Sequence, residues 1–172
     1  EEYSKTIDAQ IAGSLEKIRY EFYSFERRLL EVLSPARRLE RCLLCAIVSS
    51  SGPKDLLHTS MLAIEGGVDI IQLREKSLPD SDILKSACDL RRLTEDNEVL
   101  LIINDRADIA SACGADGVHV GPDDLPVAEA RRLLGPQAII GASVHSPREG
   151  VAAEAQGADY LGVGALFPTI TK

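Results

Sequence analysis

The fold is decided by the stretch Gly67-Val68-Asp69-Ile70-Ile71-Gln72-Leu73-Arg74-Glu75-Lys76. A glycine ends a helical segment, an aspartate turns the chain, and a short apolar strand follows that ends in polar groups. Because successive side chains of a strand point to opposite faces, Gln72, Arg74 and Lys76 share one face. Arginine and lysine both suit phosphate oxygens. Taken alone, these residues fit either an anion site or a solvated strand end.

The opening of this stretch recurs twice, as Gly114-Ala115-Asp116-Gly117-Val118 and Gly157-Ala158-Asp159-Tyr160-Leu161. Six apolar runs alternate with amphipathic helical stretches, which predicts parallel strands joined by helical crossovers. The runs are apolar throughout, as expected for strands covered on both faces. Regular units of this kind favour a (β/α)8 TIM barrel over a doubly wound sheet. We expect six βα units, with strands seven and eight absent. The runs are 43–48, 68–73, 99–103, 118–120, 138–141 and 160–163.

A long N-terminal helix over 3–33 is predicted to precede the barrel. Its apolar residues follow a spacing of four and three, which is the seam of a coiled coil. The helix could pack on the body, pair with another subunit or belong to an upstream domain, and we favour an interface role in a homo-oligomer. The expected division is a helical extension over 1–41 and a C-terminally incomplete barrel domain over 42–172. The seam residues are Ile11, Leu15, Ile18, Phe22, Phe25, Leu29 and Val32.

Composition narrows the class of protein. The chain has 172 residues, 45% of them hydrophobic, which is enough for a sizeable core. Acids and bases balance in residues 1–41, so residues 42–172 carry the whole net charge of −8. An acidic body argues against nucleic-acid binding, and no apolar run predicts a membrane span or signal peptide. The cysteines Cys42, Cys45, Cys88 and Cys113 are interpreted as buried thiols of a cytoplasmic protein.

Polar residues follow five of the six predicted strands. In βα folds, ligands bind at the carboxyl ends of the strands, so these residues are expected to meet at one site. They are Gln72, Arg74 and Lys76; Asn104, Asp105 and Arg106; His119, Gly121, Asp123 and Asp124; Ser143 and His145; and Thr169, Thr171 and Lys172.

The content of these clusters suits a diphosphate. Asp105 and one of Asp123 or Asp124 are oxygen ligands of the kind that Mg²⁺ prefers, and cations stand nearby. Several alternatives stay open. Asp123 also fits a helix N-terminal charge, His119 a hydrogen-bonded interior histidine, and His145 an exposed loop residue. The glycines of Gly162-Val163-Gly164 fit close strand packing as well as an anion loop. Asp69, Asp116 and Asp159 are interpreted as turn residues at the opposite end of their strands.

Five ordered segments resemble thiamine-phosphate synthase across residues 42–172. They are QLREK at 72–76, IINDR at 102–106, GADGVHVGPDDLP at 114–126, IIGASVH at 139–145 and GADYLGVGALFPTITK at 157–172. The resemblance implies a transferase that joins hydroxymethylpyrimidine diphosphate to a thiazole phosphate, giving thiamine phosphate and pyrophosphate.

The resemblance also implies roles for individual residues. Arg74, Lys76 and Lys172 would be catalytic, because they would stabilise the charge that develops on the leaving diphosphate. Asp105 and Asp124 would bind Mg²⁺. The substrate-binding residues would be Gln72, Leu73, Arg74, Glu75, Lys76, Asn104 and Ser143 for the pyrimidine diphosphate, with Lys172, and Thr169, Ile170 and Thr171 for the thiazole phosphate.

Two further functions fit parts of the sequence. A thiazole tautomerase of the same superfamily would use His145 as acid and base, but it needs no pair of carboxylates such as Asp105 and Asp124. A non-catalytic, truncated barrel acting as an assembly module would explain the missing strands and the long helix. The first predicted strand also departs from the family, since it ends in Val48-Ser49-Ser50-Ser51 without an aspartate. Because the missing strands would complete the thiazole-phosphate site, a chain ending at Lys172 is expected to be nearly inactive.

Overall fold

A single parallel sheet carries the strands in the order of the chain, β1 to β6. The computed structural model describes residues 9–32, 34–49 and 53–164. A doubly wound sheet reverses its strand order at one point, whereas the wall of a barrel does not. The observed order is therefore that of a barrel wall. The strands are β1 (Cys45–Val48), β2 (Ile70–Leu73), β3 (Leu100–Asn104), β4 (Gly117–Val120), β5 (Ile139–Val144) and β6 (Tyr160–Val163).

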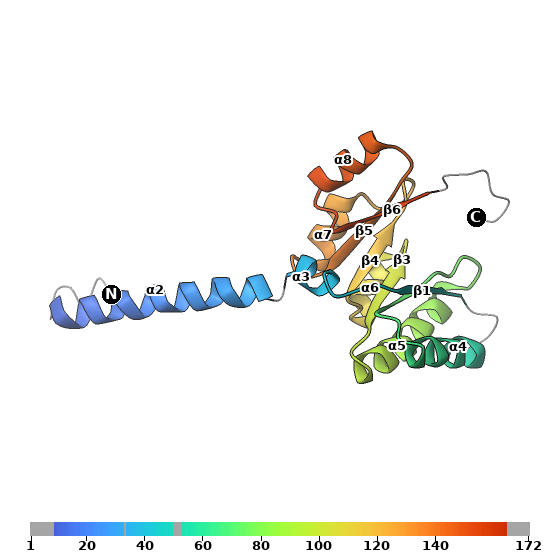
Figure 1. Cartoon of the computed structure of the whole chain (residues 1–172), viewed down its shortest axis with the longest axis horizontal. Coiled ribbons are helices and arrows are strands. Elements are labelled where there is room, and N and C mark those ends of the chain that lie inside the picture. The colour runs from blue at the N-terminus through green and yellow to red at the C-terminus, as the bar shows by residue number, and fades with distance from the viewer. Residues whose placement is uncertain (1–8, 33, 50–52, 165–172) are drawn as a thin grey trace. The chain divides into compact units, whose positions relative to one another are not determined.

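Helices alternate with the strands, as the sequence pattern predicts (Figure 1). The chain divides into two compact units, residues 1–38 and 39–172. The second unit contains α4 (Pro53–Glu65), α5 (Asp80–Asp96), α6 (Ala107–Cys113), α7 (Val127–Leu134) and α8 (Pro147–Ala155). They are preceded along the chain by α2 (Ala9–Val32) and α3 (Pro35–Leu39).

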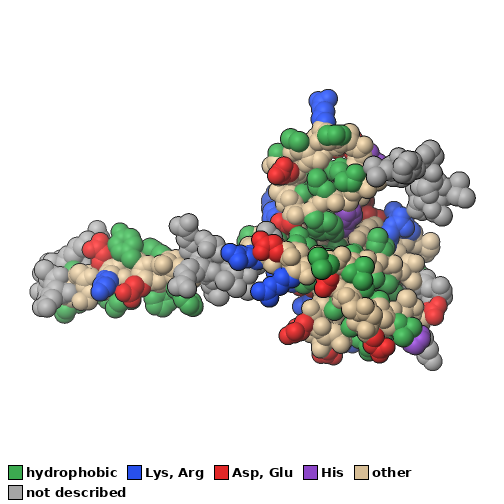
Figure 2. All heavy atoms as spheres, viewed as in Figure 1, with side chains coloured by type: hydrophobic (Ala, Val, Ile, Leu, Met, Phe, Trp, Pro, Cys, Tyr) green, Lys and Arg blue, Asp and Glu red, His purple; other side chains and the backbone are tan. Residues whose placement is uncertain are grey.

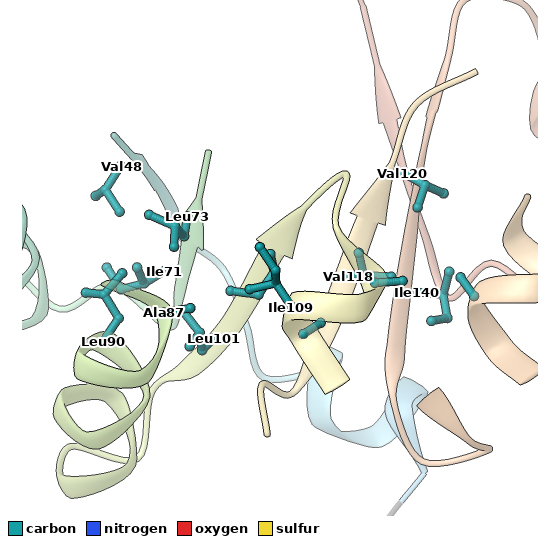
Figure 3. Packing of buried hydrophobic residues seen from close by; sticks show 14 of the residues in the cluster. Val48, Ile71, Leu73, Ala87, Leu90, Leu101, Ile109, Val118, Val120 and Ile140 are labelled. Atoms are coloured by element: carbon teal, nitrogen blue, oxygen red, sulfur yellow. The ribbon is translucent and has the colours of Figure 1, made fainter. Parts of the chain in front are cut away.

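The main core lies between the sheet and helices α4 to α8. Ile71 and Leu73 of β2 pack with Ala87 and Leu90 of α5, and all four side chains are almost completely buried (Figure 3). Burying one such aliphatic side chain stabilises the fold by about 1.5–3 kcal/mol. This core explains why the strands read as continuous apolar runs.

The opposite face of the sheet carries a smaller apolar cluster and then polar groups. Ile70, Ile102 and Ile139 form the cluster near the strand starts. Since side chains alternate along a strand, Gln72 lies on the same face as Ile70, two residues nearer the carboxyl end. The register aligns Gln72 with Ile102, and the row Asn104↔His119↔Gly141 across β3, β4 and β5 lies two residues nearer the carboxyl end of β3. The inner face is thus apolar below and polar above.

Three aspartates tie neighbouring strands together at their starts, and we call Asp69, Asp116 and Asp159 the aspartate clasps. Asp116 donates its N–H to the Leu101 carbonyl at 2.9 Å and accepts the Leu101 N–H at 2.8 Å. Asp159 does the same with Ile140, at 2.7 Å in both directions. The sequence placed these aspartates in turns away from the site, and the structure adds this clamping function.

The third clasp, Asp69, holds the start of β1. Its carboxylate accepts N–H groups of Leu43 and Leu44 at 2.7 and 2.9 Å, and these bonds lower the pKa of Asp69. Each clasp follows, two residues on, a glycine with a left-handed backbone: Gly67, Gly114 and Gly157 have φ of 88°, 68° and 95°. A side chain at these glycines would be strained.

The unit that contains α2 exposes its apolar seam. The exposed fractions of Ile18, Phe22 and Phe25 are 51%, 70% and 62%, and Figure 2 shows hydrophobic side chains along this helix. Among the described residues, no helix combines the length and the apolar character needed to span a membrane.

Candidate functional site

Two amides link the carboxyl ends of β2 and β3. Gln72 and Asn104 are both buried, and Gln72 Nε2 donates to Asn104 Oδ1 at 2.7 Å. This bond uses the oxygen of one amide and the nitrogen of the other. It leaves the Gln72 carbonyl as an acceptor and the Asn104 amide nitrogen as a donor. The pair can therefore recognise a neighbouring donor and acceptor on a flat heterocycle.

Asp105 follows directly and has a strained backbone. Its φ is 66°, in the left-handed region that non-glycine residues seldom occupy, although Asp and Asn tolerate it best. Its N–H donates to the His119 carbonyl at 2.7 Å, which holds the turn at the end of β3. The Lys76 ammonium lies 3.3 Å from Asp105 Oδ2. Strain of this kind concentrates at functional sites, because the surrounding structure must support it.

Asp124 supplies the second carboxylate of the site. Its Oδ2 accepts the Gly121 N–H at 2.7 Å, in the loop after β4. Burial raises the pKa of Asp124, the Gly121 N–H opposes that rise, and the Asp105 carboxylate within hydrogen-bonding range raises the pKa again. Asp123 is exposed instead. Of the two alternatives that the sequence left open, the structure thus brings Asp124 to Asp105.

The Asp105–Asp124 pair is the kind of group that a cation stabilises. Two carboxylates in contact repel each other when both are ionised, and a divalent cation between them removes that repulsion. In the part of the chain that the structure describes, no cluster of three or more His, Cys, Asp or Glu side chains forms. Further ligands would therefore have to come from water or from substrate oxygens, which is usual for Mg²⁺.

The two arginines near the site have different surroundings. Arg106 binds Asp80 in the first turn of α5, with Nη2 and Oδ2 2.9 Å apart, and Asp108 in the first turn of α6, with Nε and Oδ1 2.9 Å apart. These bonds raise the pKa of Arg106 and occupy its guanidinium. Within the described ranges, Arg74 makes no ion pair, so its charge is available to a ligand.

His119 lies between two hydroxyl groups on the inner face. Its Nε2 is 2.9 Å from Ser143 Oγ on β5, and its Nδ1 is 3.1 Å from Tyr160 Oη on β6. Burial lowers the pKa of His119, which the Asp105 charge partly opposes. Of the two interpretations of His119, the structure supports a hydrogen-bonded interior histidine. It also joins that histidine to Ser143, a predicted site residue.

Two glycines make room for this histidine. A Cβ atom on Gly141 would lie 2.1 Å from the Tyr160 ring and 2.5 Å from His119 Nδ1, and one on Gly162 would lie 2.9 Å from His119 Cε1. Gly162 therefore serves close packing, one of the two interpretations of the glycine pair. Tyr160 is a further residue of this site that was not predicted from the sequence. Its position directly after Asp159, where Ile70 follows Asp69, could have indicated that it faces inward.

His145 belongs to a helix cap. Its backbone N–H donates to Glu149 Oε2 at 2.8 Å, and its ring Nδ1 lies 3.5 Å from the same oxygen. Ser146 caps α8 by accepting the Glu149 N–H at 3.3 Å, and Glu149 differs from a standard capping box in accepting the N–H of His145 rather than that of Ser146. The exposed His145 side chain thus has a local structural partner, and within the described part of the chain no hydrogen bond or ion pair joins it to Asp105 or Asp124.

The other predicted site residues lie in the main core, directly after β2, or outside the described residues. Leu73 is 1% exposed and belongs to the main core, so it can offer a ligand only its backbone. Glu75 is half-buried at the end of β2. Thr169, Ile170, Thr171 and Lys172 lie outside the described residues.

Comparisons with known proteins give one consistent family. The profile of a family described as thiamine monophosphate synthase matches residues 44–172. A thiamine-phosphate synthase from Synechocystis sp. is 42% identical over 172 residues, which cover 100% of this chain and 49% of the relative. A thiamine-phosphate synthase from Gloeobacter violaceus is also 42% identical, with 100% of this chain and 50% of the relative covered. The chain spans about half the length of these curated relatives.

Solved structures agree in fold. A thiamine phosphate pyrophosphorylase from Pyrococcus furiosus superposes with a TM-score of 0.67 at 40% identity, covering 74% of this chain and 62% of that one. A deoxyribose phosphate aldolase from Aeropyrum pernix, at 16% identity, superposes with a TM-score of 0.60 over 75% of this chain and 70% of that one. The second likeness concerns the fold alone.

Proposed function

Since the chain belongs to the thiamine monophosphate synthase family, we propose that its protein couples hydroxymethylpyrimidine diphosphate to a thiazole phosphate, with release of thiamine phosphate and pyrophosphate. The observation that carries this proposal is the cluster of Lys76, Asp105 and Asp124 beside the Gln72–Asn104 amide pair. The cluster suits a cation-bound diphosphate, and the amides suit the heterocycle attached to it.

Recognition of the pyrimidine would fall to the two amides. An aminopyrimidine presents an amino donor next to a ring-nitrogen acceptor. The Gln72 carbonyl can accept from the first, and the Asn104 amide nitrogen can donate to the second. Because both side chains are buried and already bonded to each other, they are held in place before the substrate arrives, which reduces the entropy lost on binding.

Departure of the diphosphate would be assisted by cationic side chains. Arg74 and Lys76 follow the end of β2, Lys76 lies 3.3 Å from Asp105 Oδ2, and Lys172 is assigned to the same function from its motif. They would stabilise the charge that grows on the leaving oxygens as the C–O bond breaks. The aminopyrimidine delocalises the resulting cation, and the thiazole nitrogen, held nearby, attacks it to form the new C–N bond. No protein nucleophile is required for these steps.

Asp105 and Asp124 fit a magnesium ion, because they are adjacent carboxylates and burial together with Asp105 raises the pKa of Asp124. When bound, Mg²⁺ would supply positive charge to the diphosphate oxygens. The thiazole phosphate is assigned to Thr169, Ile170 and Thr171 on the resemblance of their motif. His145 is engaged in the α8 cap, so the tautomerase alternative gains no support.

The proposal extends to architecture. We place the catalytic domain at 42–172 and the helical extension at 1–41, and we propose that two further strands close an eight-stranded barrel between β6 and β1. Both edge strands expose apolar side chains, with Ile47 63% and Val163 64% exposed, which supports a covered edge in the whole protein. A cytoplasmic location is proposed because phosphorylated substrates carry charges that cross bilayers poorly.

We further propose that α2 pairs with α2 of a second copy in antiparallel orientation. With Phe22 and Phe25 on the seam, Arg19 and Glu26 flank it at equivalent positions. In the antiparallel pair Arg19 faces Glu26 of the second copy. In the parallel pair Glu21 would face Glu26, and like charges repel. The charge pattern therefore favours the antiparallel arrangement.

The proposal is tested by pyrophosphate release. This chain and a version extended by two further βα units would receive the pyrimidine diphosphate, the thiazole phosphate and Mg²⁺. We expect turnover by the extended version that a chelator abolishes. Asp124→Asn should reduce it by about a hundredfold, in the range found when one charge-stabilising group is removed. The matched control Asp123→Asn, on the exposed neighbour, should keep turnover near the wild-type level. Absence of pyrophosphate release from the extended version would overturn the proposal.

A further inference from the structure

Tyr160, His119 and Ser143 form a hydrogen-bonded chain that ends at the site. The chain crosses three neighbouring strands, from β6 through β4 to β5, with distances of 3.1 Å and 2.9 Å. Tyr160 and Ser143 are both half-buried, and Ser143 lies two residues beyond Gly141, the residue of β5 that the register aligns with His119 and Asn104. The proposed reaction uses Ser143 and leaves the other two residues without a function.

The direction of each hydrogen bond between Tyr160, His119 and Ser143 follows from counting donors and acceptors. A neutral imidazole has one donor nitrogen and one acceptor nitrogen. If Nδ1 carried the proton, it would donate to Tyr160 Oη, and Nε2 would accept the Ser143 hydroxyl proton. The Tyr160 O–H would then have no acceptor among the described residues, and a buried unsatisfied donor is unfavourable.

The other tautomer satisfies every group. Tyr160 O–H donates to Nδ1, Nε2–H donates to Ser143 Oγ, and the Ser143 hydroxyl proton points away from His119 toward the half-buried site. Phosphate oxygens accept hydrogen bonds and cannot donate them when ionised. Only this tautomer lets Ser143 donate to a diphosphate while His119 supports its oxygen.

We propose that Tyr160 is a positioning residue which fixes the Nε2-protonated tautomer of His119, so that Ser143 is held as a hydrogen-bond donor to the substrate diphosphate. The identity of that ligand rests on the proposed function, whereas the tautomer does not. Gly141 and Gly162 agree with the assignment. A Cβ at either position would collide with the His119 or Tyr160 ring, so two strands give up side chains to admit this arrangement.

The tautomer of His119 can be measured by NMR without an assay of enzyme activity. Nitrogen-15 chemical shifts distinguish a protonated from an unprotonated ring nitrogen, and the chain has three histidines, so the His119 signals can be assigned by their loss in His119→Gln. We expect a protonated Nε2 and an unprotonated Nδ1 in the wild type, and a mixture of both tautomers in Tyr160→Phe. A proton on Nδ1 in the wild type would overturn the proposal.

Binding supplies the second readout, with the pyrimidine diphosphate and Mg²⁺ as the probe in calorimetry. Tyr160→Phe should weaken binding by about threefold to tenfold, the range for one hydrogen bond, with a larger effect on KM than on kcat. In Ser143→Ala the same Tyr160→Phe change should have no further effect, because the hydroxyl through which it acts is gone. Equal losses in both backgrounds would show a merely structural function and overturn the proposal.

Two comparisons of variants distinguish an effect through the Nε2 donor of His119 from a general structural effect. His119→Gln places an amide donor near the Nε2 position and should retain more binding than His119→Asn, whose shorter side chain reaches only the Nδ1 position. Tyr23→Phe removes a hydroxyl from the exposed face of α2 and should change nothing. If the wild type binds no diphosphate, the proposed function fails, and the nitrogen-15 spectra still decide the tautomer.

Discussion

At the scale of single residues, Asp105 combines strain with charge. Its left-handed backbone would be relieved by glycine and is tolerated by asparagine, so these two substitutions separate conformation from carboxylate. Alanine would remove the carboxylate and strain the turn at once, and it is therefore a poor probe. The same residue lies 3.3 Å from the Lys76 ammonium and raises the pKa of Asp124, so its charge affects the whole cluster.

We predict that Asp105→Asn keeps the fold and lowers pyrophosphate release by about a hundredfold, because the turn is preserved while the charge is lost. Asp105→Gly should unfold at a temperature equal to or above the wild type and be equally inactive. Thermal unfolding and the coupling assay, both on the extended chain, measure the two quantities. Full activity in Asp105→Asn would contradict the assignment of Asp105 as a cation ligand.

Residue identities at the site were only partly predictable from the sequence. Gln72 follows from the alternation of β2, whereas Lys76 lies in the loop beyond the end of that strand at Leu73, so alternation does not specify its approach to Asp105. The choice between Asp123 and Asp124 depends on the loop after β4, whose backbone no periodicity specifies. Arg106 has the position of a ligand residue, but its partners Asp80 and Asp108 start two different helices, and only the folded chain brings them together.

At the scale of elements, Arg106 connects the first turns of α5 and α6. Hydrogen bonds from Arg106 lower the pKa of Asp80 and of Asp108. A carboxyl group with a lowered folded pKa stabilises the protein fully above its unfolded pKa, about 4. That stabilisation is lost as the pH falls from there through the lowered pKa.

Arg106→Gln should therefore lower the denaturant midpoint at pH 7, and the difference from wild type should shrink as the pH falls below about 4. Equilibrium unfolding at a series of pH values measures it. Arg92→Gln is a suitable control, since Arg92 pairs with Asp89 on one exposed helix face and should show little effect at any pH. A difference for Arg106→Gln that stays constant with pH would show that these carboxylates are not its source.

The helix α2 is the second element with a testable consequence. If its seam pairs with a second copy, Phe22→Lys places a charge in that seam and should convert a dimer into a monomer in sedimentation velocity. Tyr23→Lys, on an exposed neighbour off the seam, should leave the dimer intact. A monomeric wild-type protein, or a dimer that survives Phe22→Lys, would exclude pairing through this helix.

At the scale of the whole molecule, the sheet has two edges. β1 and β6 each have one strand neighbour among the described residues, and both expose apolar side chains, including Leu161 at 40%. Unpaired apolar edges promote association between chains. An extension by two βα units that closes the barrel should therefore raise the unfolding temperature and reduce concentration-dependent association. Unfolding scans and light scattering of both versions measure this, and equal values would argue against closure.

The parallel, sequential sheet was predictable because six apolar runs separated by helices allow few other arrangements. The contacts between side chains on the inner face of the sheet were less predictable. The alternation within β4 and β5 places His119 and Ser143 inward, but the contact between Tyr160 and His119 depends on two glycines on two other positions of the wall. In the sequence, Gly162 fits close packing and an anion loop equally well, and only the distances in the folded chain show which rings Gly141 and Gly162 admit.

The carboxylates of the aspartate clasps group the six strands into consecutive pairs. Each carboxylate connects an even strand to the odd strand before it, so β1 with β2, β3 with β4, and β5 with β6 form three matching modules, while the backbone carbonyls of Asp69 and Asp116 accept N–H groups from the next odd strand. Within each module, the hydrogen bonds to the aspartate carboxylate lie at the amino ends of the strands, far from the polar groups at the carboxyl ends. One additional module of this kind would bring the count to eight strands, and seams between modules are the natural places to cut and rejoin such a chain. Permuted chains opened between α5 and β3 should hence refold more readily than chains opened inside a module.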